Sequence, residues 1–204
     1  RQGDITVCDT LAYLVHEYTR TMMLGLLMTE PSRVLLLGLG GGCLARSLVS
    51  LLPTVRIQAV ELREKVVEVA RDYFGLPGED NLTVVIDDAR HWLKGAEPAC
   101  VDLVFADLYE ANGISACQNE VRFVRHVDRV LTAQGCLVAN FHHVPSFNSP
   151  FFEALSRTFA SLFLCSVASG NTILFASKAD FQDDIRSTLF APAERLGEAM
   201  GAYL

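Results

Sequence analysis

The chain has 204 residues, of which half are hydrophobic, and its 17 basic and 24 acidic residues give a formal charge of −7. This length and composition suffice for one domain with a substantial core. The acidic balance argues against a protein that binds nucleic acid through a basic face. The longest purely apolar stretches, such as "MMLGLLM" (22–28), are shorter than the ~18 residues needed to span a bilayer, so no membrane partner is expected.

The six cysteines are scattered, without a Cys-x-x-Cys pair or a histidine at ligand spacing. Neither a zinc site nor a disulfide scaffold is therefore expected, and reduced thiols fit a cytoplasmic protein. The sequence shows no internal repeat, low-complexity tract or linker-like segment. We expect a single domain over 1–204, with a helical lead-in (1–30), a catalytic core (31–178) and a C-terminal helical tail (179–204).

Along the chain, a helix is expected within 11–29, and short apolar runs then alternate with helix-like segments. The runs typical of strands are "RVLLLG" (33–38), "VRIQAVE" (55–61), "NLTVVI" (81–86), "VDLVFAD" (101–107) and "GCLVANF" (135–141). The amphipathic segments between them are 43–52, 63–73, 87–94 and 117–131. Strands separated by helix-length crossovers predict a parallel sheet covered on both faces, with right-handed connections.

After residue 141 the pattern changes to a helix near 149–162 and then to "FLCSVAS" and "TILFASK", which flank Gly170 and Asn171. Two apolar runs around that pair predict an antiparallel hairpin. A helical tail over 180–203 completes the chain. The predicted fold is α/β, with a doubly wound, mostly parallel seven-stranded sheet and an antiparallel C-terminal hairpin, the Rossmann-like layout of the AdoMet-dependent methyltransferase fold.

Four glycines (Gly38, Gly40, Gly41 and Gly42) lie where the first predicted strand turns into the first crossover helix. Without Cβ atoms they let a ligand approach the backbone closely, next to the unpaired N–H groups of the helix N-terminus. The same glycines would also suit a tight turn that binds nothing.

Acidic residues follow the next two predicted strands. Glu61 ends the second strand beside the glycine loop, where its carboxylate can accept both hydroxyls of a ribose. Asp88 follows the third strand and is placed to accept a hydrogen bond from an adenine amino group, with Ala89 leaving room for the base. A solvated carboxylate at Glu61 and a helix cap at Asp88 are the alternatives, and Asp88 can combine both roles.

The ordered motifs resemble the spermidine synthase-like branch of the class I AdoMet-dependent transferases over about residues 16–140. The matching segments are "HEYTRTMMLGLL", "LLLGLGGGCLARSL", "AVELREKVVEVARDYFGL", "VVIDDARHWL", "DLVFADLYEANG" and "LTAQGCLVAN". The resemblance implies that the donor nucleoside binds at Gly38, Gly40, Gly41, Gly42, Glu61, Leu62, Asp88, Ala89 and Asp107. It also implies that Asp107 faces the reacting centre next to Tyr109, and that Glu110, three residues on, holds a polyamine.

The sequence departs from the aminopropyltransferases of this branch at two places. They carry an Asp in the glycine loop that binds the donor's amine, and Cys43 stands there instead. A neutral thiol cannot replace a charge-assisted hydrogen bond. Their Tyr-Gln-Glu aligns with Arg20, Thr21 and Met22, and Arg20 would repel a polyammonium substrate.

These departures favour methyl transfer from S-adenosyl-L-methionine (AdoMet) to a small-molecule or protein acceptor. Two alternatives stay open: aminopropyl transfer from decarboxylated AdoMet to a diamine, and a non-catalytic nucleoside-binding or dimerisation module. A homodimer is one expected assembly.

Histidines and aromatic residues near the predicted ligand edge have two interpretations each. His142 and His143 follow the fifth strand, where one of them could act as an acid or base or where both could lie on the surface. His16, Glu17 and Tyr18, on the lead-in helix, either cover the donor or belong to an ordinary amphipathic face. Trp92 is expected to pack in the core.

Overall fold

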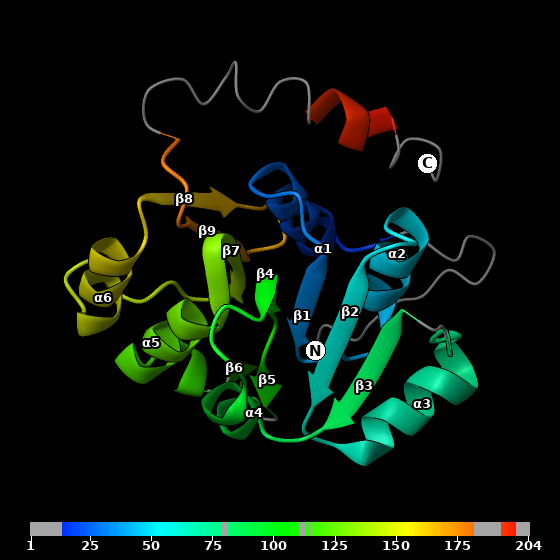
Figure 1. Ribbon diagram of the computed structural model, residues 1–204. Helices are drawn as coiled ribbons and strands as arrows, with labels where there is room; N and C mark the ends of the chain where they lie inside the picture. The colour runs from blue at the N-terminus through cyan, green and yellow to red at the C-terminus, as the bar shows by residue number, and fades with distance from the viewer. Residues whose placement is uncertain (1–13, 79–80, 111–112, 115, 182–192, 199–204) are drawn as a thin grey trace.

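The computed structural model describes residues 14–78, 81–110, 113–114, 116–181 and 193–198. Seven of its strands form one sheet in the order β3-β2-β1-β4-β7-β9-β8 (Figure 1). They are β1 (Arg33–Leu37), β2 (Arg56–Glu61), β3 (Leu82–Ile86), β4 (Val101–Ala106), β7 (Leu131–Phe141), β8 (Ser161–Ser166) and β9 (Thr172–Ser177). β1, β2, β3, β4 and β7 pair in parallel, whereas β9 is antiparallel to both β7 and β8. The predicted fold is therefore confirmed.

Helices cover both faces of this sheet, and each face has its own hydrophobic core. The elements are α1 (Glu17–Met22), η1 (Met23–Leu27), α2 (Cys43–Leu51), α3 (Glu64–Phe74), α4 (Ala89–Gly95), η2 (Ala116–Asn119), α5 (Val121–Val130) and α6 (Pro150–Thr158). One core contains buried side chains of α1, η1, α2 and α3, and the other those of α4, α5 and α6. Neighbouring residues of β1 divide between them: Leu36 packs in the first and Leu35 in the second, as the alternation of side chains along a strand requires.

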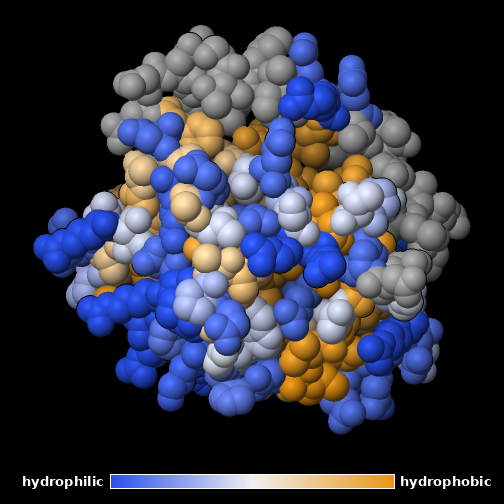
Figure 2. Space-filling view, in the orientation of Figure 1, coloured by the Kyte–Doolittle hydropathy of each residue, from blue (hydrophilic) through white to orange (hydrophobic). Residues whose placement is uncertain are grey.

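The surface is largely polar on the face shown in Figure 2, with an apolar area over the β2–β3 side of the sheet. Large apolar side chains are exposed at the ends of both strands, at Leu62 and Ile86. None of the described helices combines the length and the apolar composition that crossing a bilayer requires.

The N-terminal helical segment is shorter than predicted, and its second half is a 3-10 helix. Within the described part of 11–29, α1 and the 3-10 helix η1 together span Glu17–Leu27. A Cβ on Gly25 would collide with the side chain of Val138 on β7, so this glycine lets the segment lie directly on the sheet. Residues 11–13 of the predicted helix lie outside the described residues.

The C-terminal half differs from the prediction at its boundaries. α5 ends at Val130 and β7 begins at the next residue, so the predicted helix 117–131 is shorter and the predicted strand 135–141 is longer than expected. The β8–β9 connection runs through residues 167–171 rather than two residues, with Gly170 at a φ of +94°. Residues 193–198 are helical, and the rest of the predicted tail from 182 onward lies outside the described residues.

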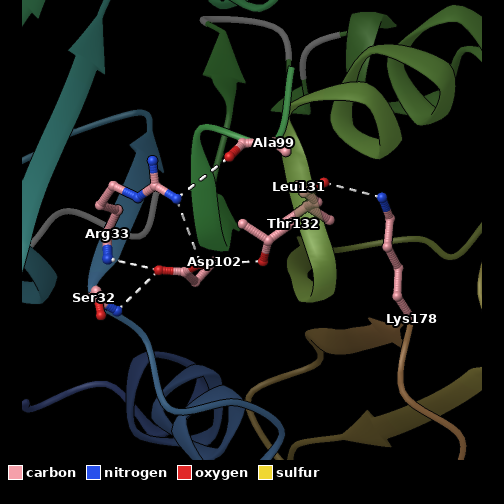
Figure 3. A network of polar contacts seen from close by, with 7 residues as sticks. All are labelled: Ser32, Arg33, Ala99, Asp102, Leu131, Thr132 and Lys178. Atoms are coloured by element: carbon pink, nitrogen blue, oxygen red, sulfur yellow. Dashed lines mark hydrogen bonds and ion pairs between the residues drawn. The ribbon is translucent and has the colours of Figure 1, made fainter. Parts of the chain in front are cut away.

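A carboxylate joins the starts of three strands at the edge opposite to the glycine loop (Figure 3). Asp102, on β4, accepts hydrogen bonds of 2.9 Å from the backbone N–H groups of both Ser32 and Arg33, where β1 begins. The hydroxyl of Thr132, on β7, donates to its other oxygen at 3.1 Å. The side chain is largely shielded from solvent, so we infer that these bonds fix the relative positions of β1, β4 and β7.

Replacing Asp102 by alanine should therefore destabilise the fold. We expect Asp102→Ala to lower the free energy of unfolding by about 1–3 kcal/mol, because the N–H groups of Ser32 and Arg33 and the hydroxyl of Thr132 lose a charged acceptor. Urea denaturation followed by circular dichroism measures the change. Asp72→Ala, at an exposed position of α3, is the matched control, and equal effects of the two substitutions would contradict the assignment.

Candidate functional site

A cavity of about 250 Å³ opens at the carboxyl edge of β1, β2, β3 and β4. In open parallel sheets this is the edge where ligands bind. The cavity brings together eight residues that the sequence singled out: Gly38, Gly40, Glu61, Leu62, Asp88, Ala89, Asp107 and Tyr109. Gly41 and Gly42 are not among its lining residues, and the side chain of Glu110 lies outside the described part of the structure.

The glycine loop between β1 and α2 is built from left-handed backbone. Gly38, Gly40 and Gly42 have φ values of +89°, +55° and +78°, which residues other than glycine rarely adopt. A Cβ on Gly38 would overlap the carbonyl oxygen of Asp107, and one on Gly42 would come within 2.7 Å of Leu76. Gly38 therefore lets the ends of β1 and β4 meet at the cavity, whereas Gly42 serves the packing beneath it.

Glu61, the last residue of β2, holds the loop in place from a buried position. One carboxylate oxygen accepts from the N–H of Leu39 at 3.0 Å, and the other accepts from the N–H of Arg63 at 3.1 Å and from its Nε at 3.4 Å. The alternative of a solvated strand-end carboxylate is thus wrong. The oxygen that accepts from Leu39 takes only this one hydrogen bond and keeps a second lone pair, so Glu61 can also accept from a ligand hydroxyl.

Asp88 caps α4 and lines the cavity at the same time. Its Oδ1 accepts from the backbone N–H of Arg90 at 2.8 Å, and the guanidinium of Arg90 donates to both carboxylate oxygens, at 3.2 and 2.9 Å. These hydrogen bonds hold the pKa of Asp88 below its usual value, so the group stays ionised near neutral pH. The predicted helix-capping role is confirmed, and Ala89 stands beside it on the cavity wall.

Asp107 follows β4 and faces the cavity together with Tyr109. The amide of Asn140, on β7, donates to Asp107 Oδ1 at 2.8 Å and lies 3.4 Å from the hydroxyl of Tyr109. Burial, reinforced by the charge of Asp107, raises the pKa of Tyr109, so its phenol stays neutral. The site thus pairs a carboxylate that can accept a proton with a phenol that can donate a hydrogen bond.

Asn140 was missed by sequence reasoning. The sequence feature that could have pointed to it is a single amide side chain within the apolar run "GCLVANF". In the structure this side chain is almost fully buried. His142 lies beyond it and packs edge-on against the ring of Tyr109, with centroids 5.0 Å apart. His143 is exposed. Neither histidine is among the cavity-lining residues.

The N-terminal helix contributes different residues from those expected. The guanidinium of Arg20 donates to the carbonyl oxygens of Leu14 and Val15, at 2.9 and 3.0 Å, and Arg20 is not on the cavity wall. Its predicted repulsion of a polyammonium substrate therefore has no structural basis. Tyr18 and Thr19 line the cavity instead, which supports the covering role for Tyr18.

Cys43 is the first residue of α2 and lines the cavity beside the glycine loop. Among the described lining residues of α1, the loop and the start of α2, none is acidic. This wall therefore offers no carboxylate to a ligand, as the sequence comparison of the loop predicted.

Comparison with known proteins agrees with this architecture. Residues 14–172 match the spermine/spermidine synthase domain model. A polyamine aminopropyltransferase of Neisseria meningitidis is 29% identical over 198 residues, which cover 95% of this chain and 75% of that protein. A probable polyamine aminopropyl transferase of Bifidobacterium longum is 30% identical over 165 residues, covering 81% of this chain and 34% of that protein.

Among solved structures, human methyltransferase-like protein 13 in complex with SAH superposes with a TM-score of 0.79 at 24% identity, covering 90% of this chain and 92% of that one. A probable spermidine synthase from Corynebacterium glutamicum gives a TM-score of 0.70 at 21% identity, with 87% and 71% covered. At these identities the structures show a shared fold. The domain match, which spans most of the chain, shows more: the chain belongs to the spermine/spermidine synthase family and is an AdoMet-related transferase.

Proposed function

We propose that the chain transfers an aminopropyl group from decarboxylated AdoMet to an amine acceptor. The observation that carries the proposal is the convergence of Glu61, Asp88 and Asp107, from the ends of β2, β3 and β4, on one cavity beside the glycine loop of β1. The sequence alone favoured methyl transfer, but the relatives that match over most of the chain are polyamine aminopropyltransferases.

Each residue has a role that follows from its position. Glu61 accepts hydrogen bonds from the ribose hydroxyls and Asp88 from the adenine amino group. Asp107 accepts a proton from the acceptor ammonium, and the free amine attacks the carbon next to the sulfonium. The carbon–sulfur bond breaks as the carbon–nitrogen bond forms, and the thioether nucleoside leaves. Alignment of the two substrates supplies much of the catalysis in such an in-line displacement.

Methyl transfer from AdoMet is the second candidate, and the identity of Cys43 favours it. An aspartate at this position in aminopropyltransferases binds the ammonium of the decarboxylated donor, and a thiol makes no such charge-assisted bond. The chemistry is otherwise alike, because Asp107 would again accept the proton of an attacking nucleophile. Incubation with each donor and putrescine, followed by mass spectrometry of the products, distinguishes the two reactions.

Asp107 should dominate turnover rather than donor binding. We expect Asp107→Asn to lower kcat by about 10²–10⁴-fold, the usual contribution of a general base, while donor affinity stays within a few-fold. Steady-state kinetics and calorimetry measure the two quantities. Asp72→Asn, at the exposed position of α3, is the control. A kcat within a few-fold of wild type for Asp107→Asn would remove Asp107 from the reaction.

Glu61 should instead govern binding of the nucleoside. Glu61→Ala is expected to weaken methylthioadenosine binding by about 1–3 kcal/mol, because the ribose hydroxyls lose an ionised acceptor. Isothermal titration calorimetry tests this, with the exposed Glu64→Ala as the matched control. Unchanged affinity of the Glu61 variant would place the ribose elsewhere.

Cys43 should set the preference between donors. Cys43→Asp is expected to shift binding towards decarboxylated AdoMet, because the new carboxylate attracts its ammonium and repels the carboxylate of AdoMet. The measured quantity is the ratio of the two dissociation constants, in which general damage from the substitution partly cancels. A ratio unmoved by the substitution would show that the donor's tail does not reach Cys43. Cys165→Asp, in β8 and remote from the cavity wall, is the control.

A further inference from the structure

A chain of buried amides connects the β8–β9 hairpin to Asp107. Asn171, the last residue before β9, donates from Nδ2 to Asn140 Oδ1 at 2.9 Å. Asn140 then donates from its own Nδ2 to Asp107 Oδ1 at 2.8 Å. Both asparagine side chains are almost completely buried, and neither lines the cavity. The amides therefore reach the carboxylate from behind the cavity wall.

The hydrogen bonds that link Asn171, Asn140 and Asp107 all run in one direction. An ionised carboxylate can only accept, so the amide nitrogen of Asn140 must face Asp107 and its oxygen must face Asn171. The hydroxyl of Ser169 lies 3.5 Å from Asn171 Oδ1, which orients the Asn171 amide in the same sense. Every donor in the series thus points towards Asp107.

The backbone around the two ends is also fixed. Gln118 is fully buried, donates to the carbonyl oxygen of Asn140 at 2.8 Å and accepts from the N–H of Leu108 at 3.3 Å. The turn that carries Asn171 is closed by hydrogen bonds between Val167 and Asn171 and between Gly170 and Val167. The chain of amides therefore spans two rigid supports, and a change at Asn171 acts on Asp107 through Asn140.

We propose that Asn171 is a positioning residue that sets the orientation of the Asp107 carboxylate through the amide of Asn140. Tyr109 belongs to the same network, because its hydroxyl oxygen accepts from Asn140 Nδ2 at 3.4 Å and also from Asn171. The phenol O–H is thereby left to act as a donor towards Asp107 or a substrate. This inference extends the proposed function, in which Asp107 accepts the proton, to a hairpin residue outside the cavity.

Two substitutions at one site separate positioning from simple packing. Asn171→Ala removes the donor that fixes the Asn140 amide. Asn171→Asp keeps the size and shape of the side chain but places a carboxylate against Asn140 Oδ1, so that the Asn140 amide turns its nitrogen away from Asp107. A buried carboxylate destabilises the fold in either case, so the two variants are compared by their effect on Asp107 in the folded protein and not by their stability. Positioning through Asn140 predicts that Asp107 is affected more strongly in Asn171→Asp than in Asn171→Ala.

The control is Ser166→Ala in the same hairpin. Ser166 shares a 3.1 Å hydrogen bond with Thr172, next to Asn171, and is not bonded to Asn140. This variant disturbs the hairpin locally and should leave Asp107 unaffected. Asn171→Ser, whose side chain is too short to reach Asn140, replaces Asn171→Ala if the alanine variant fails to fold.

The primary measurement is the titration of Asp107 by carbon NMR of protein with labelled aspartate carboxyl groups, with the resonance assigned through Asp107→Asn. Because a donor N–H favours the ionised carboxylate, we expect the titration midpoint to rise in Asn171→Ala and to rise further, by about one pH unit or more, in Asn171→Asp. The other ionisable groups on the cavity wall, chiefly Glu61, Arg63, Asp87, Asp88, Arg90 and Tyr109, are the same in all variants compared.

Turnover supplies the second measurement. Misplacing a reacting group should lower kcat by roughly tenfold or more, with donor affinity unchanged and the acid limb of the pH profile moved to higher pH.

A midpoint that stays at the wild-type value in both Asn171 variants would overturn the proposal, as would equal shifts in Ser166→Ala. If the wild type turns over neither donor, the proposed function fails, while the NMR titration still tests whether Asn171 orients Asp107 through Asn140.

Discussion

The cavity depends on one buried carboxylate, that of Glu61. The left-handed glycines of the loop have no side chains that could fix their backbone, and the N–H groups of the loop need a fixed acceptor. Glu61 provides one by accepting from Leu39 in the loop and from Arg63 beyond β2. The carboxylate thus ties the end of β2 to the β1–α2 turn, and the shape of the cavity follows from that contact.

The rest of the site is assembled by the sheet itself. The central strands run parallel, so the residues that follow them converge on one edge although they are far apart in the sequence. Gly38 permits the closest of these approaches, since any side chain there would overlap the Asp107 carbonyl. At the opposite edge, Asp102 fixes the starts of β1, β4 and β7. Anchors at both edges keep the strand ends in register with each other.

Periodicity in the sequence predicted the parallel strands and placed Glu61 and Asp88 after two of them, because buried parallel strands are strongly apolar and end in polar residues. The role expected of Asp107 came from the family resemblance. It could not predict contacts made across the sheet between distant segments. Asn140 looked like one polar residue in a strand, and Asn171 like part of a turn. Their pairing depends on the antiparallel register of β7 and β9, in which Asn140 faces Ile173. The orientation of Arg20 depended on the path of the backbone just before α1, where the carbonyl oxygens of Leu14 and Val15 accept from its guanidinium.

The three acidic side chains Glu61, Asp88 and Asp107 differ in the charge of their hydrogen-bond partners. Arg63 neutralises Glu61 at the ribose end, and Arg90 neutralises Asp88 at the adenine end. Asp107 contacts the neutral amide of Asn140, which brings no positive charge. A neutral amide orients a carboxylate without competing for its charge, whereas an arginine would hold it in an ion pair. In the proposed function, Asp107 marks the end of the cavity at which the sulfonium and the ammonium would meet.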